Sequence, residues 1–350
     1  MLLNILKNSL LYSIGSLSTK PFFHRKISSF IDHHSVKFHL IPRFERRPSV
    51  PFQILLYHRI LPEDDPFAIG VVTVENFREQ TKNLISYFRI VSLDDIINEL
   101  EIGKLQPNTI CITFDDGYYD NYQYAFPILK EFRIPATIFL TTDLIGSQKM
   151  LWHDKVLQII KNTEVDNFRF KINGRNSFNL TSINKKKEVA NELLEWMKKL
   201  LPEEREQKIQ ELKKTCQIDN NETKRLMLNW NEVKEMHSAG ISFGAHTKNH
   251  PILSLLSWDQ IEEEIESSKY AIEKNLGDKV QTFAYPNGKQ NDFDERCKKI
   301  VKQAGYRCAV TSYGGVNNAE DDLYELSRFS PWDVNPKCFL GRILLERMQT

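Results

Sequence analysis

Two short polar motifs follow runs of apolar residues and carry the side chains best suited to chemistry. The motif TFDDG ends an apolar stretch with Asp115 and Asp116, two acids that need a cation or hydrogen bonds if they are buried. The motif HTKNH follows the stretch ISFGA and contains His246 and His250. Imidazole nitrogen and carboxylate oxygen are ligands of zinc-like divalent metals. Each motif alone is also typical of a polar turn, but together they predict a site for one metal ion.

A third motif, FAYPNG, comes later in the chain and ends another apolar run. Pro286 has no N–H group, so the first free backbone donor after it belongs to Asn287. Gly288 lets this loop approach a substrate closely. The alternative interpretation is an ordinary Pro-Asn-Gly turn.

The order of TFDDG, HTKNH and FAYPNG resembles the polysaccharide deacetylase family, also called the NodB-homology family or carbohydrate esterase family four. This resemblance implies a distorted (β/α) barrel that removes acetyl groups from N-acetylated sugars. It implies that Asp115 is the general base and that Asp116, His246 and His250 bind one divalent metal. We expect zinc, with cobalt, nickel or iron as alternatives. In the family, the backbone N–H that corresponds to Asn287 stabilises the oxyanion.

The chemistry of these side chains agrees with the implied roles. A metal with three protein ligands keeps a position open for water and can lower the pKa of that water to about 7. Asp115 can then accept the proton as water attacks the acetamide. We also expect Tyr285, Pro286 and Trp332 to contact the sugar, Trp332 by stacking, although core packing explains a tryptophan equally often.

Two features of many family members are missing from this sequence. Ala284 lies where the third motif commonly carries an arginine that orients the base, and no histidine follows His250 to act as the leaving-group acid. His58 ends the apolar run FQILLY, which is similar to the permuted arrangement of biofilm poly-N-acetylglucosamine deacetylases. Because barrel strands end on one face, His58 can lie near Asp115 and protonate the amine; the alternative is a histidine that caps the core. Arg328 is the candidate partner of Asp115, or else an ordinary surface arginine.

The elements that must position these residues alternate between β-favouring and helix-favouring stretches, which predicts an α/β fold with parallel strands and outer helices. Expected strands are 52–57, 109–114, 136–140, 241–245, 280–285 and 307–311. Expected helices are 76–88, 93–100, 121–132, 231–239, 259–275 and 295–304. We interpret 51–335 as the deacetylase domain, with a charged helical insertion at about 152–228, and 336–350 as a C-terminal helix.

Residues 1–50 differ from the rest in charge. They hold eight Lys or Arg and two acids, a net charge of +6, whereas the whole chain carries +1. Apolar residues three or four apart give an amphipathic helical stripe, formed by Leu3, Leu6, Leu10, Ile14 and Leu17. Such a helix packs either on the protein itself or on an anionic membrane surface. We therefore expect peripheral membrane contact through residues 1–50.

The composition narrows the class of protein. With 350 residues, 41% hydrophobic and 27% charged, the chain is typical of a soluble globular protein. Its near-neutral balance argues against a nucleic-acid partner, which would need a strongly basic face. The longest charge-free N-terminal stretch, 8–19, is too short for a membrane span and too polar for a typical signal peptide. Five scattered cysteines without a CxxC pair favour a reducing compartment. We expect a cytoplasmic location, with secretion as the alternative.

The leading functional hypothesis is a metal-dependent hydrolase that removes N-acetyl groups from a glycan or glycan precursor. The same site could instead hydrolyse O-acetyl esters or a small cyclic amide, because activated water attacks either. A third hypothesis, from a different class, is a carbohydrate-binding protein on a catalytically decayed barrel. Metal content distinguishes the enzyme hypotheses from the third one.

Overall fold

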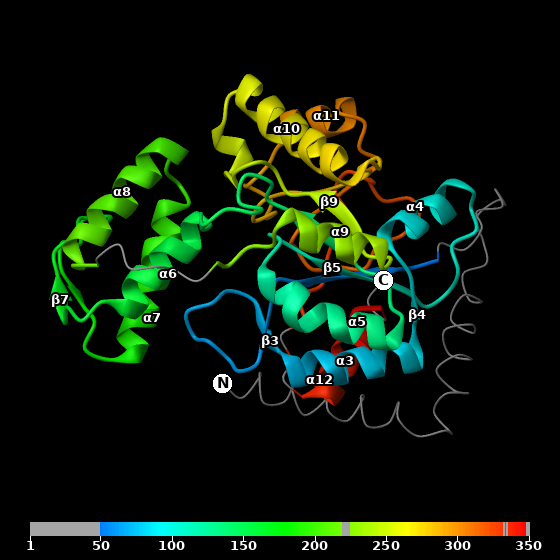
Figure 1. The fold of residues 1–350 in the computed structure, drawn as a ribbon, viewed down its shortest axis with the longest axis horizontal. Coiled ribbons are helices and arrows are strands. Elements are labelled where there is room, and N and C mark those ends of the chain that lie inside the picture. Colours follow the sequence, from blue (N-terminus) through cyan, green and yellow to red (C-terminus); the bar gives the residue numbers. More distant parts are fainter. Residues whose placement is uncertain (1–49, 219–224, 332, 334, 348–350) are drawn as a thin grey trace, which may run out of the picture.

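The computed structural model describes residues 50–218, 225–331, 333 and 335–347. At its centre lies a seven-stranded parallel sheet with helices around it (Figure 1). Six strands follow one path, in the order β1 (Gln53–Tyr57), β5 (Thr109–Phe114), β6 (Thr137–Leu140), β9 (Ser242–Ala245), β10 (Thr282–Ala284) and β11 (Cys308–Val310). The short strand β4 (Arg89–Ile90) also pairs with β5. Parallel pairing brings the carboxyl ends of these strands to one edge.

The central strands are buried along their whole length. Every residue of β1 and β5 is inaccessible, including the apolar runs ILLY and ICITF. Such continuous apolar strands are typical of a parallel sheet covered on both faces. The sheet curves into a half-barrel, and the segment 326–329 bridges its two edges: the Leu56 N–H donates to the Phe329 carbonyl at 2.9 Å, and the Leu326 N–H donates to Ala309 at 3.0 Å. The predicted α/β barrel-type fold is confirmed.

The helices around the sheet also lie where the sequence predicts them. They are α3 (Val74–Tyr87), α4 (Leu93–Glu101), α5 (Phe126–Phe132), α9 (Trp230–Ser238), α10 (Trp258–Leu276), α11 (Glu295–Gln303) and α12 (Pro336–Arg347). A π-helical turn, η2 (Asn121–Ala125), precedes α5, and a short 3-10 turn, η3 (Leu253–Leu255), precedes α10. Side-chain caps begin several of them; Ser92 accepts from the Asp95 N–H, and Asn229 and Glu232 form a capping box.

The helical insertion forms a unit with its own core, on the left of Figure 1. It contains α6 (Trp152–Asn162), the antiparallel pair β7 (Asn167–Phe168) and β8 (Phe178–Asn179), α7 (Ile183–Met197) and α8 (Pro202–Thr215). Its buried apolar side chains make a cluster separate from the barrel core. One member of that cluster, Phe67, comes from the barrel side of the chain.

Phe67 lies in the loop 62–70, which joins β2 (Arg59–Leu61) to β3 (Val71–Thr73). These two strands pair in parallel, so the loop must return to the start of β2 before β3 begins. Figure 1 shows this blue loop extending from β3 toward α7. The barrel and the insertion therefore meet through a loop as well as through α6.

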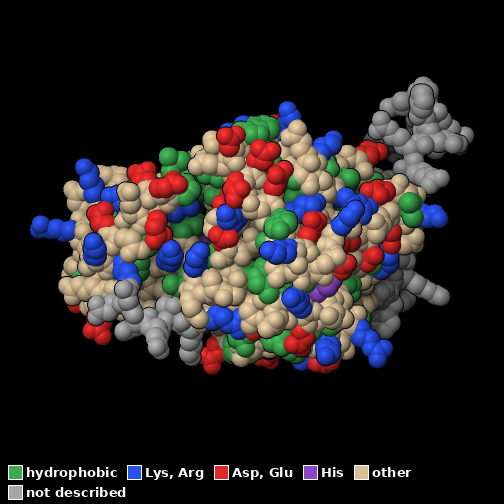
Figure 2. Space-filling view, turned by 45° about the horizontal axis from the view of Figure 1, so that its top comes forward, with side chains coloured by type: hydrophobic (Ala, Val, Ile, Leu, Met, Phe, Trp, Pro, Cys, Tyr) green, Lys and Arg blue, Asp and Glu red, His purple; other side chains and the backbone are tan. Residues whose placement is uncertain are grey.

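The surface and the termini add little that bears on the site. On the face in Figure 2, acidic and basic side chains are interspersed, in keeping with the formal charge of +1. Within the described ranges, no helix has the length and apolarity to span a bilayer. The amphipathic segment predicted for residues 1–50 lies outside the described residues, apart from Val50. All five cysteines are free thiols.

Candidate active site

The acid pair follows directly from the carboxyl end of β5, and His246 follows β9 two strands away. Gly117 turns the chain sharply after the acids with a φ of +82°, and a Cβ there would lie 2.8 Å from the Leu140 side chain. Only glycine combines that φ with so close an approach. The strand ends and this turn bring Asp115, Asp116 and His246 to the same edge of the sheet.

Asp116, His246 and His250 form a buried cluster. The Asp116 Oδ1 atom lies 3.5 Å from His246 Nε2 and 3.3 Å from His250 Nε2. One ligand atom from each of the three residues lies within 4.8 Å of the others. Asp116 Oδ1 is inaccessible and has no hydrogen-bond partner among the described residues. A buried carboxylate oxygen without a partner fits a cation that is held between these side chains.

The two histidines are held differently. His246 Nδ1 lies 2.7 Å from the Ala284 carbonyl, and donation to that carbonyl leaves a lone pair on Nε2 for a metal. His250 Nδ1 is buried and unpartnered within the described part of the chain. The His250 ring instead packs edge-on against His246 at 4.9 Å and His153 at 5.6 Å. Ring packing therefore takes the place of a hydrogen bond at His250.

Backbone strain occurs in all three motifs, which hold four of the eight non-glycine residues with a positive φ in the described part of the chain. Left-handed φ angles occur at Asp116 (74°), Thr247 (66°), His250 (59°) and Asn287 (58°). This conformation is especially unfavourable for a β-branched residue such as Thr247. The Thr247 Oγ1 accepts the His250 N–H at 3.0 Å, which holds the loop in shape. Strain of this kind persists where surrounding contacts fix it, and it gathers at functional sites.

The electrostatics of the cluster favour a cation. Burial raises the pKa of Asp116 well above its usual range, and the Asp115 and Asp154 carboxylates raise it further. Burial lowers the pKa of His246, and that of His250 well below its usual range, so both rings are neutral. A divalent ion would favour the ionised form of Asp116, which burial disfavours, and would bind the two neutral imidazoles.

Asp115 has a different partner. Arg328 is fully buried and donates to both carboxylate oxygens of Asp115, at 2.7 and 2.6 Å. Its Nε also donates to the Thr311 carbonyl at 2.6 Å. Burial acts to raise the pKa of Asp115, but Arg328, with His246 and His58, lowers it overall. Asp115 is thus an ionised carboxylate in a fixed orientation.

The position of Arg328 follows from the closure of the sheet. It lies in the segment 326–329, which bridges β11 and β1. Because this segment crosses the edge where β5 ends, its arginine reaches Asp115 even though 213 residues separate them in sequence. The structure therefore contains the pair that the sequence nominated; its catalytic role remains a prediction.

His58 lies between β1 and β2, half-buried, and its carbonyl accepts a hydrogen bond from Asn121 at 2.8 Å. Burial lowers the pKa of His58 to about 4, while Asp115 acts to raise it and Arg328 and His246 act to lower it. These interactions place the imidazole in the same charged cluster as the acid pair. In the free protein His58 is therefore neutral near pH 7.

The FAYPNG motif forms a tight loop beside β11. A Cβ on Gly288, whose φ is +60°, would lie 2.8 Å from the Ser312 N atom. The Asn287 carbonyl accepts from the Ser312 hydroxyl. The Asn287 backbone N–H, by contrast, finds no acceptor among the residues that the structure describes, which suits a donor that faces substrate.

The predicted sugar contacts receive less support. Tyr285 is buried, stacks on Phe293 with ring centroids 4.0 Å apart, and donates its hydroxyl to the Tyr324 carbonyl at 3.0 Å. This core position does not support a substrate contact by the Tyr285 side chain. Pro286 is also buried. Trp332 lies outside the described residues.

A buried polar group lies at the start of the insertion, where the sequence offered His153 only as a possible residue of the cleft rim. The Tyr118 hydroxyl donates to Asp154 at 3.0 Å and lies 3.1 Å from His153 Nε2. His153 and Asp154 belong to the first turn of α6, and the His153 ring packs on His250. Their only sequence signal was three polar or aromatic residues, WHD, at the point where the insertion begins. The insertion therefore reaches the candidate metal ligands directly.

Arg59 completes this buried network. Its Nε donates to Asp120 at 2.5 Å, and its guanidinium covers the Tyr118 ring at 4.2 Å. Together with the Asp115–Arg328 pair, the site thus holds four buried acids, Asp115, Asp116, Asp120 and Asp154, beside the buried arginines Arg59 and Arg328.

Comparison with known proteins places this site in a family. The profile described as Polysaccharide deacetylase matches residues 102–309, more than half of the 350 residues. The chain belongs to this family. It is similar to "Putative polysaccharide deacetylase YxkH" of Bacillus subtilis, with 25% identity over 225 residues, which are 64% of this chain and 52% of that protein.

A shorter match and a solved structure agree with this assignment. "Poly-beta-1,6-N-acetyl-D-glucosamine N-deacetylase" of Staphylococcus epidermidis is 39% identical over 77 residues, 22% of this chain and 27% of that protein. The chain thus spans about half the length of the first relative and about a quarter of the second. Among solved structures, the Streptococcus pyogenes deacetylase PplD in complex with acetate has a TM-score of 0.56 at 22% identity, covering 83% of this chain and 97% of that one. This likeness shows the fold.

Proposed function

We propose that this protein is a metal-dependent hydrolase that removes N-acetyl groups from a glycan or glycan precursor. The observation that carries the proposal is the unpartnered Asp116 Oδ1 between two neutral histidines, directly beside the Asp115–Arg328 pair. A cation site next to a fixed, ionised carboxylate is the arrangement that hydrolysis of an acetamide needs. The name of the staphylococcal relative supports an N-acetylated sugar polymer as the substrate class.

Asp116, His246 and His250 would hold the metal. Two nitrogen ligands and one oxygen ligand suit zinc, and cobalt, nickel or iron are the alternatives. A divalent ion at this position would lower the pKa of a bound water and polarise the acetamide carbonyl.

The other residues would move protons and stabilise charge. Asp115, kept ionised by Arg328, accepts a proton from the water that attacks the acetamide. The Asn287 backbone N–H donates to the carbonyl oxygen as negative charge develops there. His58 gives a proton to the departing amine. Because burial keeps His58 neutral in the free protein, it would take up this proton from solvent once negative charge has built up on the substrate, and Asp115 would return its own proton to solvent after acetate forms.

The proposal is tested by acetate release from a panel of N-acetylated and O-acetylated saccharides, with protein supplied with zinc, cobalt or nickel. We expect release from an N-acetylated saccharide that depends on the metal. Asp115→Asn should keep its metal and lose about 10²- to 10⁴-fold in turnover, because a general base contributes that much. Release from O-acetylated saccharides alone would favour the esterase alternative, and a protein that binds no metal and releases no acetate would favour the binding protein.

A further inference from the structure

The loop 62–70 ends directly beside His58 for a topological reason. β2 and β3 are parallel, and Arg59 pairs with Val71. A parallel connection must bring the chain back to the level at which the first strand began. Gly70, the residue before Val71, therefore lies next to His58, the residue before Arg59.

The contact between Gly70 and His58 is close. A Cβ on Gly70 would lie 3.0 Å from His58 Nδ1 and 3.3 Å from His58 Cβ and Cγ. The φ of Gly70 is +64°, a conformation that glycine adopts without strain. The imidazole thus rests against the backbone of Gly70, and any shift of the loop 62–70 would remove or displace this support.

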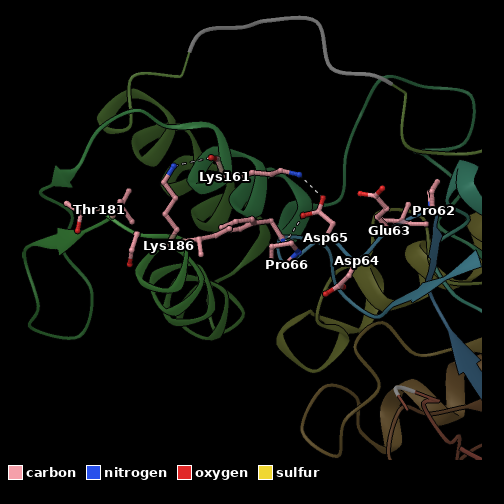
Figure 3. Close-up of a pocket in the computed structure, with 13 residues that line it drawn as sticks. Pro62, Glu63, Asp64, Asp65, Pro66, Lys161, Thr181 and Lys186 are labelled. Carbon is pink, nitrogen blue, oxygen red and sulfur yellow. Dashed lines mark hydrogen bonds and ion pairs between the residues drawn. The ribbon is translucent and has the colours of Figure 1, made fainter. Parts of the chain in front are cut away.

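Two contacts attach the loop to the insertion. Phe67 is 7% exposed, and it is the buried residue of an otherwise open loop, packed in the apolar cluster of the insertion. Asp65 accepts from Lys161 of α6 at 2.6 Å and, through its other oxygen, from the Phe67 N–H at 3.0 Å. Figure 3 shows the Asp65–Lys161 pair across the interface.

An open pocket lies beside these two contacts, between the loop and the insertion. A cavity of about 810 Å³ lies between residues 61–67 and the insertion residues Lys161, 180–183 and Lys186. Figure 3 shows Glu63 and Asp64 on the opposite side of Asp65 from Lys186 and Thr181. The position of the loop therefore depends on Phe67 and Asp65 more than on continuous packing.

We propose that the helical insertion positions His58 through the loop 62–70, with Phe67 and Asp65 as its anchors and Gly70 as the support of the imidazole. Phe67, Asp65 and Gly70 are positioning residues that act on His58. The expected effect on turnover rests on the proposed role of His58 as the general acid. The expected effect on the position of the ring does not.

The direct test uses protein with ¹⁵N-labelled histidine, in which the absence of one signal in His58→Ala assigns the His58 imidazole. Phe67→Ala should shift the His58 resonances and leave those of His237, which pairs with Asp278 at 2.7 Å, unchanged. The matched control is Phe170→Ala, which removes a phenyl ring of the same cluster at a position outside the loop 62–70, where the ring packs on Phe168 and Trp196. Phe67→Leu should restore the His58 signal. An unmoved His58 signal in folded Phe67→Ala, or an equal shift in Phe170→Ala, overturns the proposal.

Two further variants keep the test open if Phe67→Ala does not fold. Lys161→Met breaks the second anchor at an exposed position and should shift the same signal. Gly70→Ala should displace the ring by steric contact, whereas Gly174→Ala carries a similar left-handed φ with nothing within 4 Å and should not. Unchanged His58 resonances in both Lys161→Met and Gly70→Ala contradict the proposal.

Kinetics separate this proposal from the proposed function. Phe67→Ala should lose about 10- to 100-fold in turnover of an N-acetylated saccharide, and much less with an activated acetyl ester, whose leaving group needs no proton. His58→Ala should show the same selectivity. Equal losses of His58→Ala on both substrates would contradict the acid role of His58, while the resonance test would still decide whether the insertion positions the ring.

Discussion

Asp116 is a buried acid whose Oδ1 atom has no hydrogen-bond partner among the described residues, and burial raises its pKa well above the usual range. In metal-free protein Asp116→Asn should therefore be at least as stable as the wild type, since the amide removes an unfavourable buried acid. Its metal affinity should fall by about 100-fold or more, beyond what loss of an outer partner causes. Elemental analysis and chemical denaturation measure the two effects.

Asp292 supplies the matched control for this prediction. It is also buried, but Lys198 pairs with it at 2.8 Å. Asp292→Asn should lower the free energy of unfolding and leave the metal content unchanged, because it removes a compensated charge. If metal-free Asp116→Asn lost as much stability as Asp292→Asn, the Asp116 carboxyl would have a stabilising partner in the protein, contrary to our interpretation.

Arg328 should set both the stability and the pH dependence of the site. Arg328→Met leaves Asp115 buried without its cation, and breaking such a pair costs about 3–5 kcal/mol. Arg328 lowers the pKa of Asp115, so its removal raises that pKa. The pH at which activity appears on the acid side should therefore move to higher pH. Denaturation and a pH–rate profile are the measurements.

Arg225 provides a surface control. It donates to both carboxylate oxygens of Glu232 at 2.8 and 2.6 Å, in a more exposed position than Arg328. Arg225→Met should cost about 1 kcal/mol or less and leave the pH–rate profile in place. An acid limb that stays unmoved in Arg328→Met would exclude Asp115 as the titrating base.

The elements of the barrel were predictable because their signals are local. The apolar composition of the run from Thr109 to Phe114 predicts a buried strand, and a capping residue such as Ser92 predicts where a helix begins. The acids and histidines of the site were predictable for the same reason, since each follows such a run within a five-residue motif. Their geometry then follows from parallel pairing.

Several features that depend on distant partners were not predictable, although the Arg328–Asp115 pair was nominated in place of the arginine missing from the third motif. The stretch 121–132 reads as one helix, yet it begins as a π-helical turn in which Asn121 donates to the His58 carbonyl, 63 residues away. The Tyr118–Asp154 hydrogen bond and the Asp65–Lys161 pair likewise join positions with no shared sequence pattern. Tyr285 belongs to the third motif, but its side chain lies in the core, where it stacks on Phe293 and donates its hydroxyl to the Tyr324 carbonyl.

The loop that presents Asn287 should be sensitive to a single methyl group. Gly288→Ala combines a left-handed φ with a contact of 2.8 Å to the Ser312 N atom, so the loop must move. Gly277→Ala has a similar φ and nothing within 4 Å. Both variants should lose stability through backbone strain, but Gly288→Ala alone should lose turnover, by about 10²-fold or more. Equal turnover in the two variants would contradict the proposed role of the Asn287 N–H as the oxyanion donor.

At the scale of the whole molecule, the N-terminal segment remains a sequence-based proposal. The net charge of +6 and the apolar stripe of residues 1–50 should bind anionic vesicles. Sedimentation with anionic and neutral liposomes, at low and high salt, measures this binding. A variant that lacks residues 1–49 should stay in solution and release acetate at the same rate as the full chain, if the proposed function is correct. Binding that ignores both lipid charge and salt would contradict the electrostatic part.

The position of the segment 326–329 in the chain means that the site is completed late during synthesis of the protein. The segment bridges β1 and β11 and also places Arg328 beside Asp115. The docking of this one segment therefore closes the half-barrel and pairs the proposed base with its arginine. While the chain is being synthesised, the ribosome releases the acid pair some two hundred residues before the arginine that neutralises it. We expect the nascent protein to stay inactive, with the edges at β1 and β11 unpaired, until residues 326–329 emerge.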